Sequence, residues 1–169
     1  MPILIFIVTL FLSTFINSKE PCKYVTFTTN DEVKYTEQKS IRVSDVEDHF
    51  IRIFKTETKH KNSKKNCEGL KLSKTDFFGI SDYTKKNGEV SGYSIGTYND
   101  GSKIFSRLNG ISHTPLDQTQ NGLVTLTISI TGGTGKYKGI AGYGKGKTEF
   151  NPETGYSSGK TEIFYMLRN

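Results

Sequence analysis

The sequence predicts a single, mainly β-structured domain built from antiparallel strands that close into a barrel or fold into a sandwich. Three observations lead to this prediction. Apolar and polar residues alternate with a period of two through most of the chain after residue 20. Asn-Gly and Asp-Gly pairs, which favour tight hairpin turns, separate several of the alternating runs. The 169 residues include 17 glycines, and glycine inside a strand often marks a bulge or a bend.

The first 18 residues are predicted to be a signal peptide, which leaves residues 19–169 as the domain. Residues 1–16 read MPILIFIVTLFLSTFI and carry no charged side chain, as expected for the apolar part of such a peptide. An uncleaved membrane anchor and a buried N-terminal helix are the alternatives. The apolar run is slightly shorter than the ~20 residues of a membrane-spanning helix. We therefore expect a secreted or periplasmic protein, with a membrane-anchored protein as the second interpretation.

The predicted strands follow one another at short and regular spacing. They cover residues 23–29, 41–43, 49–56, 75–84, 89–98, 103–109, 123–131, 143–150 and 161–167. The clearest alternation lies in 123–131, which predicts an inward face of Val124, Leu126, Ile128 and Ile130. Because each pair stands between two such runs, Asn87-Gly88 and Asp100-Gly101 are predicted to be hairpin turns.

Residues 57–66 show no alternation and are predicted to be an exposed loop. This loop contains Lys59, Lys61, Lys64 and Lys65, and the whole chain has a formal net charge of +6. Such a loop is suited to weak contact with anionic surfaces. Aromatic residues that could stack on bases are missing between its lysines, so no nucleic acid is expected as a partner.

The sequence contains two cysteines, Cys22 and Cys67. In an exported protein two cysteines can form one disulfide. The bond would join the start of the first strand to the end of the lysine-rich loop. Two separate thiols are the alternative.

Two glycine-containing segments resemble a known family of barrels. Residues 131–142, TGGTGKYKGIAG, resemble the glycine-rich signature of the allene oxide cyclase and dirigent barrels, and especially of small exported bacterial members without assigned activity. Residues 92–110, GYSIGTYNDGSKIFSRLNG, are similar to the matching hairpin of those bacterial proteins. The resemblance implies an eight-stranded antiparallel barrel with a cavity, and a homo-oligomer such as the trimers of plant members. It transfers no activity, because the residues that the plant proteins use do not align.

Other kinds of chemistry lack their sequence signals. The segment GGTGKY is not a phosphate loop, because Tyr137 follows Lys136 where Ser or Thr is required. The histidines His49, His60 and His113 have no acidic or cysteine partner at ligand spacing. Nucleophilic catalysis needs a serine or cysteine with a base and an orienting acid, and Cys67 lies beside the lysine-rich loop without a paired histidine signal. We expect neither a metal nor a cofactor.

One strand and its neighbour supply the best candidates for a ligand site. Lys103, Phe105, Arg107 and Asn109 share one face of a predicted strand, and the preceding strand carries Tyr93 and Tyr98. Inside a barrel, an arginine flanked by aromatic rings would orient an anionic or carbonyl-bearing molecule. A later strand could add the carboxylate of Glu149. The alternative places Arg107 on the outer face.

These residues predict an exported barrel that binds a small, partly hydrophobic molecule, with Tyr93, Tyr98, Phe105, Arg107 and Glu149 as ligand-binding candidates. A cyclase or isomerase acting on a hydrophobic substrate is the second hypothesis, in which Glu149 or a tyrosine moves protons. The third is a non-catalytic envelope or interaction protein whose barrel is filled by side chains. The sequence leaves open whether the protein is an enzyme.

Overall fold

The computed structural model describes residues 20–117, 120–151 and 153–168. The predicted signal peptide, residues 1–18, lies outside the described residues. Within these three ranges, no helix is long and apolar enough to cross a membrane.

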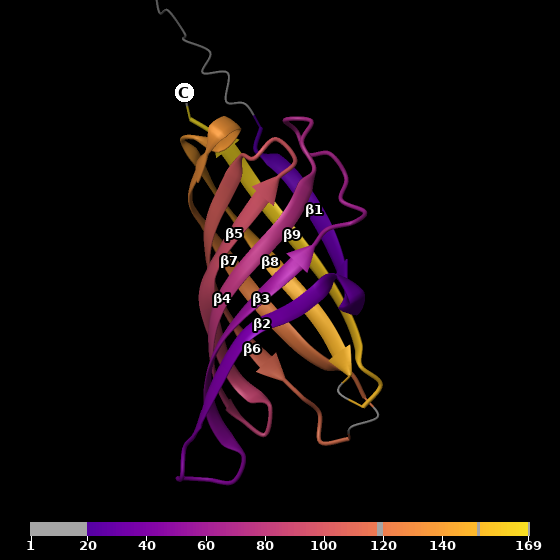
Figure 1. Cartoon of the computed structure of the whole chain (residues 1–169), viewed down its shortest axis with the longest axis vertical. Coiled ribbons are helices and arrows are strands. Elements are labelled where there is room, and N and C mark those ends of the chain that lie inside the picture. The colour runs from indigo at the N-terminus through magenta and orange to yellow at the C-terminus, as the bar shows by residue number, and fades with distance from the viewer. Residues whose placement is uncertain (1–19, 118–119, 152, 169) are drawn as a thin grey trace, which may run out of the picture.

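A single antiparallel sheet of nine strands makes up the fold (Figure 1). Hydrogen-bonded neighbours follow the order β1-β9-β8-β7-β6-β5-β4-β3-β2. The strands are β1 (Cys22–Thr29), β2 (Val33–Arg42), β3 (His49–Lys59), β4 (Leu72–Thr84), β5 (Asn87–Tyr98), β6 (Lys103–His113), β7 (Gly122–Thr134), β8 (Ile140–Asn151) and β9 (Tyr156–Leu167). Two short 3₁₀ helices, η1 (Asn30–Glu32) and η2 (Gly135–Tyr137), follow β1 and β7. The prediction of an all-β, antiparallel fold is therefore confirmed.

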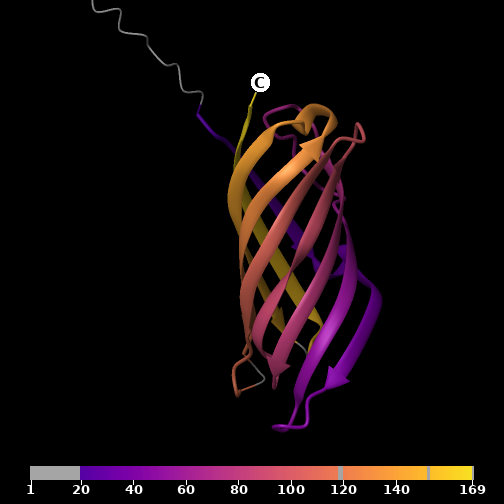
Figure 2. The same ribbon diagram turned by 90° about the vertical axis from the view of Figure 1, so that its left-hand side faces the viewer.

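The sheet curls around a central axis, but it does not close into the predicted eight-stranded barrel (Figures 1 and 2). In the described part of the chain no ladder joins β1 to β2, so these two strands are the edges of the sheet. The ninth strand is β2, for which the sequence predicted only residues 41–43. Every residue of β2 is exposed, and an edge strand without a buried face needs no apolar alternation.

The two predicted hairpin turns differ in their outcome. The turn at Asp100-Gly101 is confirmed: Gly101 has φ of 85°, and the Tyr98 amide donates to the Ser102 carbonyl at 2.9 Å. The turn predicted at Asn87-Gly88 is wrong, because in the structure the turn lies two residues earlier in the chain. Here Lys85 and Lys86 have φ of 50° and 65° and form the two-residue turn between β4 and β5, with positive φ at both central positions.

Gly88 has a different role, because it lies inside β5 against the neighbouring strand. A Cβ atom at Gly88 would lie 2.0 Å from the Asp82 carbonyl oxygen. The glycine of this Asn-Gly pair therefore permits close approach of two strands and does not make the turn.

The inward face of β7 follows the sequence prediction. Ile128 is buried, Val124, Leu126 and Ile130 are partly buried, and the intervening residues Thr125, Thr127, Ser129 and Thr131 are exposed. This alternation identifies the concave side of the curled sheet as its apolar side.

Four tyrosines fill one end of the concave side. The cluster consists of Tyr24, Tyr98, Tyr137 and Tyr165, all of them buried. The rings of Tyr98 and Tyr137 lie 4.5 Å apart between centroids. The turn that resembles the family signature brings Tyr137 here. Gly133 allows the close packing, because a Cβ atom there would lie 2.6 Å from the Lys103 carbonyl oxygen and 2.7 Å from the Tyr137 Cβ.

The loop between β3 and β4 covers the tyrosine cluster. A disulfide of 1.98 Å joins Cys22 to Cys67, which confirms the predicted pairing and ties this loop to β1. Asn66 donates to the Tyr137 hydroxyl, and Leu70 is part of the buried cluster. The loop predicted over residues 57–66 begins later than expected, because β3 continues to Lys59. Its four lysines are exposed as predicted, while its end packs against the core.

Candidate functional site

The predicted ligand-binding residues are divided between the two faces of the sheet. Tyr93 pairs with Arg107 across β5 and β6, and its ring stacks on Phe105 at 6.4 Å between centroids. The sequence thus brings these three together correctly, but the inward orientation is wrong. They alternate with the buried Ile104 and Ser106 of β6, so their side chains point outward and Arg107 is exposed.

The other two candidates lie elsewhere. Tyr98 points inward and belongs to the tyrosine cluster. Glu149 lies on the outer face of β8, where its carboxylate pairs with Lys147 at 2.9 Å. The five residues therefore do not form one site, and their predicted role in ligand binding stays a prediction.

An arginine flanked by aromatic rings does occur on the concave side, at Arg52 of β3. Its guanidinium carbon lies 5.1 Å from the ring centroid of Phe54, 5.8 Å from that of Tyr35 and 5.9 Å from that of Tyr83. The rings come from β2, β3 and β4. Arginine is held near aromatic faces by the negative quadrupole of the ring. We call Arg52, Tyr35, Phe54 and Tyr83, with Ser81, the Arg52 site.

Polar groups of the Arg52 site are left without partners inside the protein. Among the described residues, no carboxylate lies within 4.0 Å of the Arg52 guanidinium. Ser81 faces Arg52 across β3 and β4, is 1 % exposed, and its hydroxyl oxygen has no hydrogen-bond partner in the described structure. A buried polar group without a partner is rare and costs about 1–3 kcal/mol.

The Arg52 site opens toward the edge of the sheet. Tyr35 lies on the edge strand β2 and is 51 % exposed, whereas Phe54 is buried. Burial raises the pKa of the Tyr83 hydroxyl above its usual value, so this group stays protonated at neutral pH. The site therefore presents a fixed positive charge, neutral hydroxyl groups and apolar rings. This combination suits a molecule with an apolar body and an anionic or carbonyl group.

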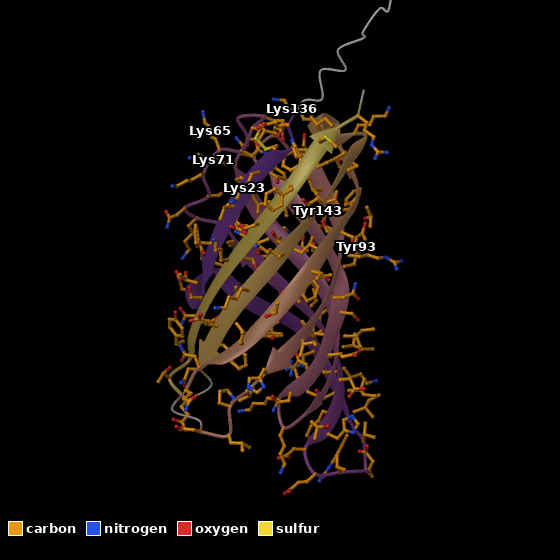
Figure 3. All side chains as sticks on the ribbon, turned by 180° about the vertical axis from the view of Figure 1, so that it is seen from behind. Lys23, Lys65, Lys71, Tyr93, Lys136 and Tyr143 are labelled. Carbon is orange, nitrogen blue, oxygen red and sulfur yellow. A yellow bond between two sulfur atoms is a disulfide. The ribbon has the colours of Figure 1, made fainter. Side chains whose placement is uncertain are left out.

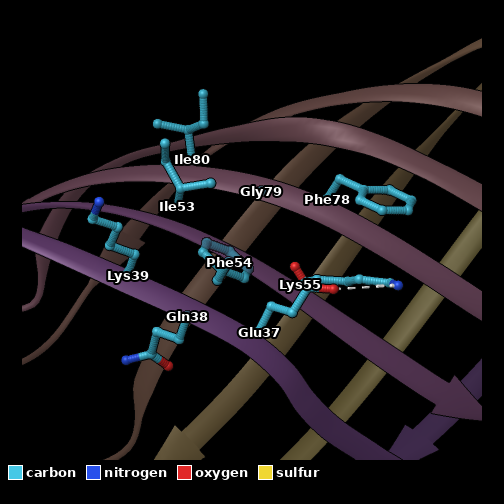
Figure 4. Close-up of a pocket in the computed structure, with 9 residues that line it drawn as sticks. All are labelled: Glu37, Gln38, Lys39, Ile53, Phe54, Lys55, Phe78, Gly79 and Ile80. Atoms are coloured by element: carbon cyan, nitrogen blue, oxygen red, sulfur yellow. Dashed lines mark ion pairs between the residues drawn. The ribbon is translucent and has the colours of Figure 1, made fainter.

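A hollow of about 480 Å³ lies next to the same three strands (Figure 4). Ile53, Phe78 and Ile80 supply its apolar wall on the outer face, and Lys55 pairs with Glu37 at 3.7 Å across it. The hollow is open, and Lys55 lies 5.3 Å from the Phe78 ring centroid. Glu37 and Lys55 are paired with each other, and Lys39 is the remaining charged group of the lining. The hollow therefore offers less specific chemistry than the Arg52 site.

In contrast, no tyrosine hydroxyl of the cluster is among the described buried polar atoms without a partner, which are Ser81 Oγ and, in the covering loop, His60 Nδ1. The Tyr24 hydroxyl contacts the Ser63 hydroxyl at 2.7 Å, and Tyr165 donates to the Glu68 carboxylate. Burial raises the pKa of Tyr137 to about 12 and raises the pKa values of Tyr98 and Tyr165 as well. These hydroxyls are neutral at physiological pH and act as internal hydrogen-bonding groups.

The described residues contain no group of three or more His, Cys, Asp or Glu side chains placed to hold a metal ion. The expectation that His49 has no acidic partner is wrong: its Nδ1 lies 2.6 Å from an Asp45 carboxylate oxygen and its Nε2 lies 2.7 Å from an Asp82 carboxylate oxygen. His60 contacts the Thr75 hydroxyl at 2.9 Å.

Comparisons with known proteins add a distant structural likeness. No model of a protein family matches the chain, and no curated protein matches its sequence. A solved structure of a pterocarpan synthase dirigent protein is similar with a TM-score of 0.45 and 10 % identity, over 90 % of each chain. A likeness of this size assigns neither a family nor an activity to this chain.

Sequence reasoning missed the Arg52 site although one of its signals was present. The run HFIRIFKT places Phe50, Arg52 and Phe54 on one face of a strand by simple alternation. Alternation alone does not say that this face is the inward one. The structure shows it, because Phe54 is buried and packs over Gly79 in the next strand. Tyr35 could not have been found, since the polar strand β2 was not predicted there.

Proposed function

We propose that this protein binds a small, partly hydrophobic molecule on the concave side of its sheet, at the Arg52 site. The observation that supports this proposal most strongly is that two neighbouring polar groups lack an ion-pair or hydrogen-bond partner in the described structure. Arg52 carries a positive charge between three aromatic rings, and Ser81 carries a buried, unpartnered hydroxyl beside it. A protein interior normally satisfies such groups. The guanidinium of Arg52 is only partly buried, so it is the group that a ligand from solution can reach and complete.

The chemistry of the Arg52 site defines the ligand in general terms. The guanidinium offers several N–H donors in a planar fork, which matches a carboxylate, a sulfonate or a carbonyl oxygen. Phe54, Tyr35 and Tyr83 would pack against an apolar or aromatic body. In this proposal binding needs the anion and the apolar body at the same time.

Two fluorescent dyes of similar shape test this proposal. One is the anion 8-anilinonaphthalene-1-sulfonate, and the other is its neutral counterpart N-phenyl-1-naphthylamine. Titration of the folded protein should give saturable binding of both dyes, with the anion bound more tightly. The change Arg52→Gln should weaken binding of the anion by roughly 10-fold or more, as expected for loss of a charged hydrogen bond, and should leave the neutral dye nearly unaffected.

Arg168→Gln is the matched control, because Arg168 is an exposed arginine that follows the end of β9, outside the Arg52 site. It should change the affinity for either dye by less than about twofold, since it lies outside the proposed site. Equal loss of anion binding in both variants, or no saturable binding in the wild type, would refute a site at Arg52.

A further inference from the structure

A continuous row of side chains crosses the outer face of the sheet from β5 to β1. Each member is the direct cross-strand partner of the next. The row, called the outer row below, consists of Tyr93, Arg107, Ser129, Tyr143, Phe164 and Lys23. Figure 3 shows Tyr93, Tyr143 and Lys23 following one another across the same side of the molecule. Adjacent strands lie about 4.8 Å apart, so these six strands span about 24 Å.

The outer row contains two aromatic platforms. Tyr143 stacks on Phe164 with 5.5 Å between centroids and an interplanar angle of 23°. Tyr93 stacks on Phe105 with 6.4 Å between centroids and an angle of 25°. Tyr143 is 64 % exposed, so its ring is available to a partner from solution. Three strand intervals separate Tyr93 from Tyr143, which places the platforms about 14 Å apart.

Positive charges lie between and beside these platforms. Arg107 stands between them, and no carboxylate of the described residues lies within 4.0 Å of it. At the end of the row, the Lys23 ammonium lies 5.6 Å from the Phe164 ring centroid. The acid Glu162 lies in the next row, where its carboxylate is 3.7 Å from the ammonium of Lys23 in the outer row, 3.4 Å from that of Lys145 and 2.9 Å from that of Lys160. This side of the sheet therefore keeps a positive surplus.

We infer that the outer row binds an acidic polysaccharide that lies across the strands. The faces of sugar rings carry C–H groups that pack on aromatic rings, where the negative quadrupole attracts them. Carboxylate or sulfate groups of such a chain would pair with Arg107 and Lys23. The hydroxyl of Ser129 lies between the charges and can exchange hydrogen bonds with sugar hydroxyls.

The spacing of the charges favours a polysaccharide over a single-stranded nucleic acid. A nucleic-acid strand carries a phosphate about every 3.4 Å, which gives about seven charges over the length of the outer row. The row offers Arg107 and Lys23, with Lys145 in the next row. A glycan with one acidic group for every two sugars has the lower charge density that this arrangement matches.

This inference does not depend on the proposed function, because the outer row and the Arg52 site lie on opposite faces of the sheet. Either site can fail without affecting the other. The dye titrations described above report on the concave side, and the experiment below reports on the outer face.

Affinity electrophoresis and calorimetry with hyaluronate test the outer row. Hyaluronate is an acidic polysaccharide with one carboxylate for each disaccharide; dextran serves as the neutral polymer and poly(dT) as the nucleic acid. The wild type should bind hyaluronate, should not bind dextran, and should bind poly(dT) more weakly than hyaluronate. Arg107→Ser and Tyr143→Ser should each weaken hyaluronate binding by about fivefold, as expected for loss of one exposed charge or one stacking ring.

Two matched variants outside the outer row control for general charge and general aromatic surface. Lys103→Ser removes another exposed cation from β6, and Tyr156→Ser removes another exposed tyrosine, at the start of β9. Both should retain affinity within about twofold. The inference is overturned if hyaluronate does not bind, if dextran or poly(dT) binds as well as hyaluronate, or if the control variants lose as much affinity as the variants of the row.

Discussion

Two regions of the concave side contain similar residues but differ in their expected roles. At one end, four tyrosines pack together beneath a loop that a disulfide fastens to β1. Nearer the opposite edge of the sheet, Arg52 lies among three aromatic rings contributed by β2, β3 and β4. Both regions are rich in aromatic side chains and contain polar groups. They differ in whether the polar groups find partners within the protein.

That difference separates a region built for stability from a region suited to binding. In the tyrosine cluster, Asn66 donates to Tyr137 and Tyr165 donates to Glu68. At the Arg52 site, the hydroxyl of Ser81 has no partner in the described structure. A satisfied polar network rigidifies a core, whereas an unsatisfied group costs stability unless something else completes it. Changes in the first region should therefore affect folding, and changes in the second should affect binding.

The largest effect on stability is expected from Tyr137→Ala. Tyr137 is 0 % exposed and contacts both Tyr98 and Tyr165. Loss of a buried aromatic ring should lower the free energy of unfolding by about 4 kcal/mol. Urea denaturation measures the change. Tyr143→Ala, on the outer face, is the control and should cost no more than about 1.5 kcal/mol, the upper range for loss of its stacked pair with Phe164. Equal losses would contradict the central place of Tyr137 in the cluster.

The second effect concerns the bond that fastens the loop. Cys22 and Cys67 are 45 residues apart, and the paired change of both to serine should lower the free energy of unfolding by about 3 kcal/mol. The loop that covers the tyrosine cluster should then exchange its amide hydrogens faster, while β6 and β7 keep their protection. Hydrogen exchange followed by mass spectrometry distinguishes this local effect from general loosening. Unchanged exchange in residues 60–71 would show that the disulfide does not hold the loop.

A smaller effect on stability is expected at Arg52. Arg52→Gln removes only cation–π contacts, because no carboxylate in the described part of the structure pairs with this arginine. The free energy of unfolding should change by no more than about 1 kcal/mol. Thermal denaturation of Arg52→Gln and Tyr137→Ala under the same conditions compares the two losses of stability. A loss as large as that of Tyr137→Ala would mean that Arg52 is part of the folding core.

The smallest expected effects are the contributions of two histidines to stability, which change with pH in opposite directions. Burial lowers the pKa of His60 below its usual value of 6.5, although Glu32 opposes the shift. As the pH falls, the unfolded chain therefore binds a proton at His60 before the folded protein does. His60 should reduce stability as the pH falls below about 6.5. The hydrogen bonds of His49 to Asp45 and Asp82 raise its pKa above 6.5. Its contribution should be present below pH 6.5 and lost as the pH rises through the folded-state pKa.

Urea denaturation of His60→Gln and His49→Gln between pH 5 and pH 8 measures these two contributions. As the pH is lowered, the free energy of unfolding of His60→Gln should fall less than that of the wild type. As the pH is raised, the free energy of unfolding of His49→Gln should fall less than that of the wild type. The same slope in both variants as in the wild type would show that neither histidine is coupled to folding.

The sequence predicted those features that alternation and turn chemistry determine locally. The inward face of β7 and the turn at Gly101 followed from spacing alone. The disulfide followed from the number of cysteines and the expected compartment. These features needed no knowledge of which side of the sheet is concave.

Features that depend on the whole sheet were not predicted correctly. Alternation shows that Phe105 and Arg107 share a face, but it cannot tell which face is buried, because both faces of β6 carry apolar residues. The edge strand β2 is exposed throughout and therefore lacks the pattern by which strands are recognised. Without β2 the position of Tyr35 was missing, and with it the aromatic surroundings of Arg52.

Native mass spectrometry tests most directly whether the concave side is a binding site. The wild type, Arg52→Gln and Arg168→Gln would be purified from their producing cells under identical, detergent-free conditions and sprayed intact. If the Arg52 site binds a ligand, the wild type and Arg168→Gln should carry a small molecule at near one-to-one stoichiometry, and Arg52→Gln should lose it. A wild type free of any bound molecule, or equal occupancy in all three proteins, would contradict a ligand site at Arg52.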